Sequence, residues 1–154
     1  MVITAVGARG NEIIFISEKH RDFFIQKVEE IPDVDVYHEA LIYCLGISED
    51  TRNHFNDVYD AKARCINVKC LNHGWQTSGT VRIVRLAFNL YCNGTPSVNL
   101  YRKTEDKVRE CTAYGPEELF CCSYAPFFWQ AIQIRYPEYA NYDYELHRSF
   151  GGRD

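Results

Sequence analysis

The sequence lacks every short signature by which the common enzyme classes are recognised. It has no HExxH zinc-protease motif, no GxSxG nucleophile elbow, no P-loop and no glycine-rich dinucleotide fingerprint. Glutamate follows His38 directly and no PCxxC segment comes after it, so the deaminase signature is incomplete as well. We therefore expect a protein that is not an enzyme.

Long apolar runs are also missing. The longest uncharged stretches fall short of the roughly 20 apolar residues that a membrane-spanning helix requires. Residues 1–10 have neither the basic start nor the apolar run of an export signal. We expect a cytoplasmic protein, in which the seven cysteines are thiols, metal ligands or core side chains rather than disulfide partners.

What the sequence does contain is helical periodicity in a chain of 154 residues, 46% of them hydrophobic. Such a chain can bury its own core, and we expect a single domain over residues 1–154. The pattern predicts a mainly α fold, a bundle of about five to six helices with a small β element. The expected helices cover 18–31, 36–45, 49–60, 79–92, 116–122 and 125–136, with N-caps at Ser17, Asp35, Ser48, Thr77 or Ser78, and Ser123 or Tyr124.

The remaining segments give weaker signals. Residues 12–17 read as one strand, and residues 97–103 and 107–114 could pair as a small hairpin. Gly46 fits the position just after a helix end. Residues 1–11 and 145–154 are expected to be loose ends.

The net charge of −4 is unevenly spread. Residues 1–60 carry twelve acids against five bases, residues 61–110 carry nine bases against three acids, and residues 111–154 carry six acids against three bases. This asymmetry predicts an acidic face and a basic patch, although ordinary solvated helix faces would give the same count. The acidic front half argues against direct nucleic-acid binding and for a partner that is itself basic.

One short segment has the composition of a metal site. Cys65, Cys70 and His73 fall within nine positions, and Zn²⁺ favours sulfur and nitrogen ligands in tetrahedral groups of four. Cys111 is the preferred fourth ligand, because it lies in a polar segment that gives a thiol no other role. Cys121 and Cys122 are expected to pack inward instead. The prediction is one structural zinc, and free thiols beside a surface histidine are the alternative.

Several ordered aromatic blocks resemble an uncharacterised family of small cytosolic proteins. The blocks are GWQT leading into RLAFNL, and SYAPFFW leading into IRYPEY. With SEKHRDFF and VYHEALIYCL near the start, the similarity covers most of residues 17–139. The family occurs in low-GC Gram-positive bacteria, their phages and mobile elements, so the resemblance implies a fold and a genomic neighbourhood but no reaction.

The sequence is also similar to type II-A anti-CRISPR inhibitors, some of which contain zinc. This resemblance implies a protein partner, a type II CRISPR effector nuclease, and no membrane. The candidate contact residues are the acids in and near the first helices: Glu18, Asp22, Glu29, Glu30, Asp33, Asp35, Glu49 and Asp50. Two other surfaces remain open: the basic stretch Arg102, Lys103, Lys107 and Arg109, and the tail tyrosines Tyr139, Tyr142 and Tyr144.

Two other classes of function remain open at this point. One is a non-catalytic bacterial regulatory or interaction domain. The other is a zinc-dependent hydrolase or nuclease, which would need a zinc ion with an open coordination position.

Overall fold

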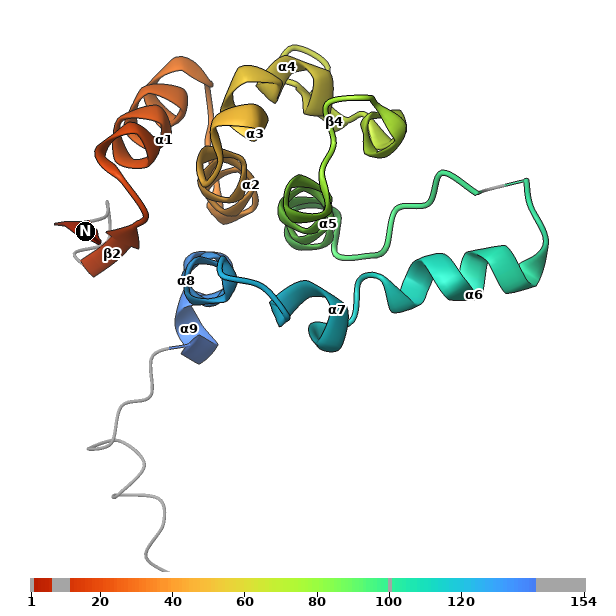
Figure 1. Ribbon diagram of the computed structural model, residues 1–154. Helices are drawn as coiled ribbons and strands as arrows, with labels where there is room; N and C mark the ends of the chain where they lie inside the picture. The colour runs from red at the N-terminus through yellow and green to blue at the C-terminus, as the bar shows by residue number, and fades with distance from the viewer. Residues whose placement is uncertain (1, 7–11, 100, 141–154) are drawn as a thin grey trace, which may run out of the picture.

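Four helices form the body of the computed structural model, which describes residues 2–6, 12–99 and 101–140. They are α1 (Glu18–Glu30), α2 (Val36–Gly46), α5 (Ser78–Cys92) and α8 (Ala125–Arg135), as Figure 1 shows. The shorter helices are α3 (Glu49–Asn53), α4 (Phe55–Val58), α6 (Thr104–Thr112), α7 (Pro116–Phe120), α9 (Pro137–Ala140) and the 3₁₀ helix η1 (Val68–Asn72). The prediction of a mainly α fold is confirmed.

Helix α2 lies at the centre of the hydrophobic core. Its residues from Ala40 to Leu45 are fully buried, and it packs against α1, α5 and α8. Figure 1 shows it between α1 and α5, with α8 beneath. A helix that is apolar on all sides can bury its side chains only when other elements surround it. None of the helices in the described ranges is long and apolar enough to cross a membrane.

The N-caps expected from the sequence for α1, α2, α3 and α5 are present. The Ser17 hydroxyl accepts a hydrogen bond from the His20 amide (3.2 Å), and Ser48 does the same for Thr51 (3.1 Å). Thr77 and Thr80 form a reciprocal capping box at the start of α5. Each cap satisfies an amide that has no carbonyl partner inside its helix, which is why these short polar residues mark helix starts.

Two expectations around the second and third helices are wrong. Gly46 is the last residue of α2 and is buried rather than lying beyond the helix end. A Cβ atom there would lie 2.4 Å from Cδ2 of His20, so the close approach of α1 requires glycine. The helix expected over 49–60 breaks at His54, giving α3 and α4, and the chain then enters strand β3 (Tyr59–Asp60), which pairs with β4 (Cys65–Ile66).

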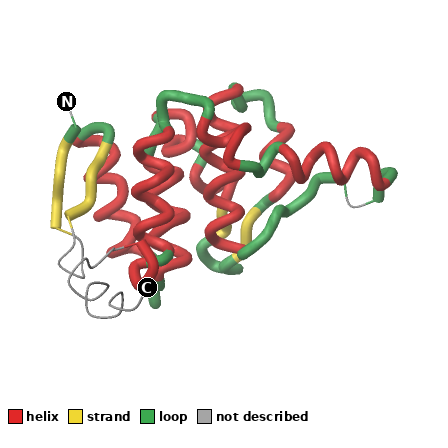
Figure 2. Tube along the Cα trace, turned by 90° about the horizontal axis from the view of Figure 1, so that it is seen from below, coloured by secondary structure: helices red, strands yellow, loops and turns green. Residues whose placement is uncertain are grey.

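The hairpin expected within residues 97–114 is also wrong, because these residues include helix α6. The Glu110 carboxylate accepts hydrogen bonds from the Ser97 hydroxyl, the Val98 amide (3.0 Å) and the Asn99 side chain (2.9 Å). These bonds fasten the preceding segment to the helix, so the two segments do not pair as strands. Figures 1 and 2 both show α6 projecting from the other helices.

The strand predicted at 12–17 is present as β2 (Glu12–Phe15), and it pairs with β1 (Ile3–Val6), within a segment expected to be loose. Figure 2 places this hairpin at the edge of the helical body. The other edge of β2 is closed by side chains: the Ile14 amide donates to Gln130 (3.1 Å), and the Tyr43 hydroxyl donates to the Ile14 carbonyl (2.5 Å). The rest of the expected loose ends, residues 1, 7–11 and 145–154, lies outside the described residues.

Candidate functional site

The four predicted zinc ligands lie on different elements and differ in burial. Cys65 is exposed on β4, Cys70 is fully buried in η1, and His73 is exposed at the end of η1. Cys111 is exposed on α6, where its sulfur lies 3.7 Å from the Thr95 hydroxyl. Among the residues that the structure describes, no three or more His, Cys, Asp or Glu side chains gather where they could hold a metal ion, so these four do not meet.

Burial gives Cys70 a different chemical character from the other predicted ligands. It raises the pKa of the Cys70 thiol to about 12, so in this arrangement the side chain is neutral and packs as a core residue. All seven cysteines are free thiols. The expectation that Cys121 and Cys122 both pack inward is half right, because Cys121 is exposed while Cys122 is partly buried and donates to the Leu119 carbonyl (3.4 Å).

The acidic residues singled out from the sequence all reach the surface. Glu18, Asp22, Glu29, Glu30, Asp33, Asp35, Glu49 and Asp50 are each exposed. They fall at two ends of the α1–α2 pair. Glu18, Asp22, Glu49 and Asp50 lie where α1 begins and α2 ends, whereas Glu29, Glu30, Asp33 and Asp35 lie where α1 ends and α2 begins. The predicted acidic face is therefore two acidic groups.

Three of these acids already have polar partners among their near neighbours. Asp22 pairs with Arg21 (2.8 Å), and Glu30 pairs with Lys27 (2.6 Å). Burial acts to raise the pKa of Asp35, but hydrogen bonds from the backbone and side chain of His38 outweigh it and lower that pKa. Asp35 thus serves α2 as a cap and is a poor choice for a contact residue.

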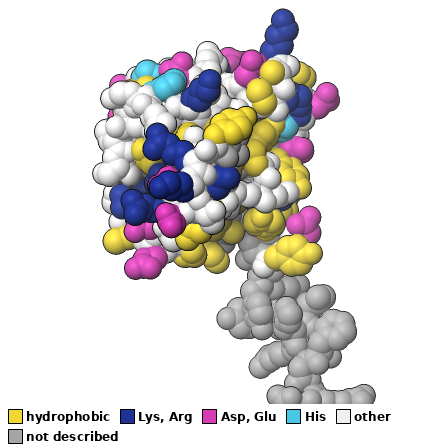
Figure 3. Space-filling model, turned by 90° about the vertical axis from the view of Figure 1, so that its right-hand side faces the viewer, with side chains coloured by type: hydrophobic (Ala, Val, Ile, Leu, Met, Phe, Trp, Pro, Cys, Tyr) yellow, Lys and Arg dark blue, Asp and Glu magenta, His cyan; other side chains and the backbone are white. Residues whose placement is uncertain are grey.

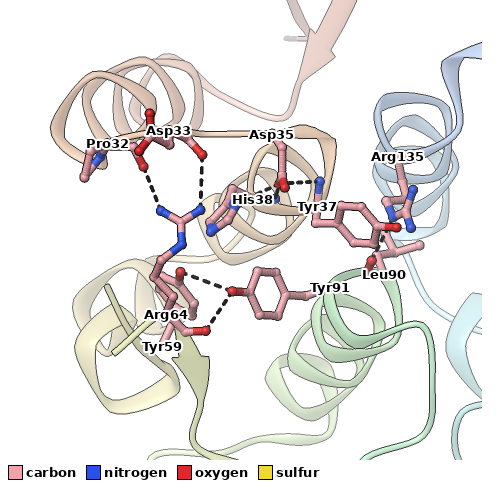
Figure 4. A network of polar contacts seen from close by, with 10 residues as sticks. All are labelled: Pro32, Asp33, Asp35, Tyr37, His38, Tyr59, Arg64, Leu90, Tyr91 and Arg135. Carbon is pink, nitrogen blue, oxygen red and sulfur yellow. Dashed lines mark hydrogen bonds and ion pairs between the residues drawn. The ribbon is translucent and has the colours of Figure 1, made fainter. Parts of the chain in front are cut away.

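A polar network, drawn in Figure 4, holds the backbone of the α1–α2 loop, which includes Asp33 and Asp35. The Arg64 guanidinium donates to the carbonyls of Pro32 (2.8 Å) and Asp33 (3.1 Å). The Arg64 carbonyl in turn accepts from the Tyr91 hydroxyl (3.0 Å), which lies 3.3 Å from the Tyr59 hydroxyl. Arg64, in the turn between β3 and β4, thereby links two parts of the structure. One is the α1–α2 loop, which contains Asp33, and the other is the C-terminal end of α5, which contains Tyr91.

His38 lies beneath this loop. Its Nδ1 atom is 2.6 Å from Asp35 Oδ1, and its ring meets those of Tyr91 and Tyr59 edge to face. Within the described part of the chain, its buried Nε2 has no hydrogen-bond partner. Because His38 is only 4% exposed, a substrate cannot reach that nitrogen, and the Asp35–His38 pair acts to position the loop.

Arg135, the last residue of α8, connects that helix to the end of α5 and the start of α2. Its Nε donates to the Leu90 carbonyl (2.9 Å) and its Nη2 to the Asn93 side chain (2.8 Å). The guanidinium also stacks 3.4 Å from the centroid of the Tyr37 ring. A cation at the last carbonyls of α5 also opposes the negative end of the helix dipole. The ends of α5 and α8 and the start of α2 therefore form one polar end of the bundle.

The backbone of this network includes all three non-glycine residues with positive φ among the described residues. They are Asp33 (53°), Arg64 (51°) and Asn93 (54°). Asp and Asn tolerate this left-handed conformation, whereas Arg seldom adopts it, and such residues persist where their surroundings fix them. Here hydrogen bonds hold all three positions, so the surface around Asp33 is presented on a fixed backbone.

Of the two alternative contact surfaces, the structure describes the basic stretch fully and the tail tyrosines only in part. Arg102, Lys103, Lys107 and Arg109 are exposed in and just before α6. Figure 3, which views the molecule from the α6 side, shows Lys and Arg side chains gathered there with acidic side chains among them. Tyr139 is 87% exposed, while Tyr142 and Tyr144 lie outside the described residues.

Comparisons with known proteins give a family and no reaction. The model of a protein family described as a family of unknown function (DUF6075) matches residues 10–148. No curated protein matches the chain, and no solved structure matches it. The function must therefore be argued from the surface just described.

Proposed function

Given that the chain belongs to the family of unknown function DUF6075, we propose that it is an anti-defence protein that inhibits a type II CRISPR effector nuclease by stoichiometric binding. The choice of partner rests on the similarity of the sequence to type II-A anti-CRISPR inhibitors. The proposal places the protein in the cytoplasm of the bacterial host, where such a nuclease acts. It assigns the protein no catalytic step.

The observation that carries the proposal is the exposure of seven acidic side chains on α1, α3 and the loop between α1 and α2, with Asp35 set aside as the cap of α2. A CRISPR effector holds its nucleic acid in positively charged channels. Exposed charges of opposite sign speed the encounter of two proteins and orient it. The loop at Asp33 adds a fixed shape, because Arg64 holds two successive carbonyls there.

A cleavage assay tests the inhibition. The purified protein is titrated against a type II effector nuclease loaded with its guide RNA, and cleavage of a target DNA is measured. We expect cleavage to stop near equal concentrations and the two proteins to co-elute in gel filtration. Inhibition at far lower concentrations would instead indicate the hydrolase or nuclease alternative. Binding without inhibition would indicate the regulatory alternative, and no association with any such nuclease would contradict the proposal.

A charge-reversal pair tests the surface. Glu49→Lys with Asp50→Lys changes two first-turn acids of α3, and Glu105→Lys with Glu117→Lys makes the same change at the first turns of α6 and α7. We expect the α3 variant to associate about tenfold more slowly at low salt, with a smaller deficit at high salt. The control variant should associate as the wild type does. If the control is the slower of the two, the partner contacts the α6 side.

The structural zinc remains a separate part of the proposal. Its sequence pattern supports it, although the described structure does not bring Cys65, Cys70, His73 and Cys111 together. Elemental analysis of protein purified without added metal tests it. If these residues hold a zinc ion, the protein should contain about one zinc per chain. That zinc should be lost in Cys65→Ser as well as in Cys70→Ser. Zinc-free protein of unchanged stability would contradict it.

A further inference from the structure

A small cleft lies between the start of α5 on one side and the end of α6 with helix α7 on the other. Its volume is about 210 Å³, and its walls are Thr77, Ser78, Val81, Arg82, Arg85, Ala113 and Glu118. Small-molecule sites usually enclose about 300–1,000 Å³, so this cleft fits one chemical group of a ligand and not a whole cofactor. The positions on α5 are spaced by three and four residues, which places them along one stripe of the helix.

Arg85 is the unusual residue in this cleft. Its Nε atom is buried and has no hydrogen-bond partner within the described residues. Its guanidinium lies 5.9 Å from the centroid of the Tyr114 ring, a contact that satisfies none of its N–H groups. The buried Nε is out of a ligand's reach, as is the Nε2 of His38. The Nη groups of Arg85 are not buried in this way and make no hydrogen bond within the described residues. They can therefore donate to a ligand in the cleft.

Arg82 provides a second positive charge beside it. Its Nε donates to the Glu118 carbonyl (2.8 Å) and its Nη1 to the Ser78 carbonyl (3.3 Å), and neither acceptor carries a formal charge. No ion pair forms at either arginine within the described ranges, and the carboxylate of Glu118 is exposed. The walls of the cleft thus carry two positive charges and one negative charge.

We propose that this cleft binds a phosphate group, either as free phosphate or at the end of a nucleotide. Two guanidinium groups and the Ser78 hydroxyl offer more donors than the two oxygens of a carboxylate can accept in good geometry. A phosphate has three terminal oxygens, and arginine binds it through two parallel hydrogen bonds. Val81 and Ala113 contribute apolar surface that lowers the local dielectric and strengthens these bonds. The inference is independent of the proposed inhibition of a nuclease.

Titration of the full chain with inorganic phosphate, followed through backbone amide signals in nuclear magnetic resonance spectra, tests the site. We expect saturable shifts that concentrate at residues 77–85 and 113–118. Arg85→Gln should weaken phosphate binding about tenfold, because it removes a charge-assisted hydrogen bond. Glu118→Gln should strengthen binding, because it removes the negative charge at the cleft. This opposite effect separates a binding role from simple damage to the fold.

Arg21→Gln is the matched control, since it removes an arginine from α1 on the other side of the bundle. It should leave phosphate affinity unchanged. A nucleoside monophosphate that binds more tightly than phosphate would assign the cleft to a nucleotide, and equal affinity would assign it to the free ion. Acetate binding as tightly as phosphate would overturn the proposal. So would shifts that never saturate, or an equal loss of affinity in Arg21→Gln.

Discussion

Helices α2 and α6 are similar in length but differ in what holds them. In α2, eight of the eleven residues are buried, from His38 through Gly46 with Glu39 excepted. In α6, none of the nine residues is buried, and Lys103 at its N-cap position makes no side-chain cap. The first helix is stabilised by the hydrophobic core on every side, and the second by a few polar contacts of Glu110.

This contrast shows which parts of the molecule are open to change. Burial of apolar area dominates the stability of α2, so a lost methylene group there is felt throughout the fold. Loss of the contacts of α6 should affect local order and leave the core intact, since elements with little buried surface open at low free-energy cost.

The largest expected difference comes from truncating one apolar side chain in each helix. Leu41 in α2 is fully buried, and Val108 in α6 is 58% exposed. Leu41→Ala should lower the free energy of unfolding by about 3 kcal/mol, because it leaves a cavity in a close-packed interior. Val108→Ala should change it by no more than about 0.5 kcal/mol. Urea denaturation measures both, and equal losses would show that α6 belongs to the core.

Acid should weaken the core through His20, whose side chain is fully buried. Its Nε2 lies 2.8 Å from the Tyr43 carbonyl, and burial lowers its pKa from 6.5 to about 4. Since the unfolded state takes up the proton first, this contribution to stability is complete above pH 6.5 and is lost as pH falls towards 4. The loss should reach about 3 kcal/mol by pH 4.

The variant His20→Gln isolates this effect, because glutamine can keep a hydrogen bond and does not titrate. We expect the variant to be less stable than the wild type at pH 7 and to lose less stability between pH 7 and pH 4. Parallel stability curves for the two proteins would show that another group causes the acid sensitivity.

A pair of glycines probes the packing at the end of α2. In Gly46→Ala the new methyl group meets the His20 ring, whereas a methyl group added at Gly74 would meet no atom within 4 Å. Gly46→Ala should cost about 1–3 kcal/mol through overpacking. Gly74→Ala, the control, should be neutral within about 0.5 kcal/mol. Thermal unfolding of both proteins checks this, and a neutral Gly46→Ala would mean that α1 and α2 can separate without loss.

The smallest effect should come from the anchor of α6. Burial acts to raise the pKa of Glu110, but the hydrogen bonds from Ser97, Val98 and Asn99 outweigh it and lower that pKa. The ionised carboxylate therefore stabilises this segment above the usual glutamate pKa, and the contribution is lost as pH falls through the lowered value. Glu110→Gln should cost about 1 kcal/mol. Hydrogen exchange should speed up at residues 97–112 and not in α2; a change confined to α2 would contradict the assignment.

The parts of the fold that the sequence predicted are those with local causes. Ser17, Ser48 and Thr77 cap helices within three residues of themselves. The apolar run of α2 and the apolar period of α5 can be recognised from the sequence alone. Helix α6 has only Val108 and Cys111 as apolar residues, and its anchor reaches back 11 to 13 residues from Glu110 to a polar loop. That contact leaves no trace in the pattern of hydrophobic residues.

The site was harder to predict than the fold. Exposure of the eight acids followed from their charge alone, but the bonds from Arg64 to the carbonyls of Pro32 and Asp33 span more than 30 residues. The buried state of His38 depends on two tyrosines from other elements. The spacing of Cys65, Cys70 and His73 suggested a shared ligand point, and the 3₁₀ turn of η1 instead directs Cys70 into the core. The one local signal for the network was an N-cap residue, Asp35, followed three positions later by a histidine, His38.

The closed edge of β2 sets how the N-terminal hairpin could take part in assembly. Gln130 and Tyr43 already occupy the polar groups of Ile14, so a strand from another molecule cannot add on that side. Strand β1 is short, uncharged and rich in β-branched residues, and no other strand of the described ranges pairs with its outer edge. Among the described residues, the outer edge of β1 is therefore the edge of this hairpin at which a strand from another molecule could pair. A charged residue in place of Val6, which is 77% exposed, should therefore reduce pairing between β1 strands of different molecules at high protein concentration.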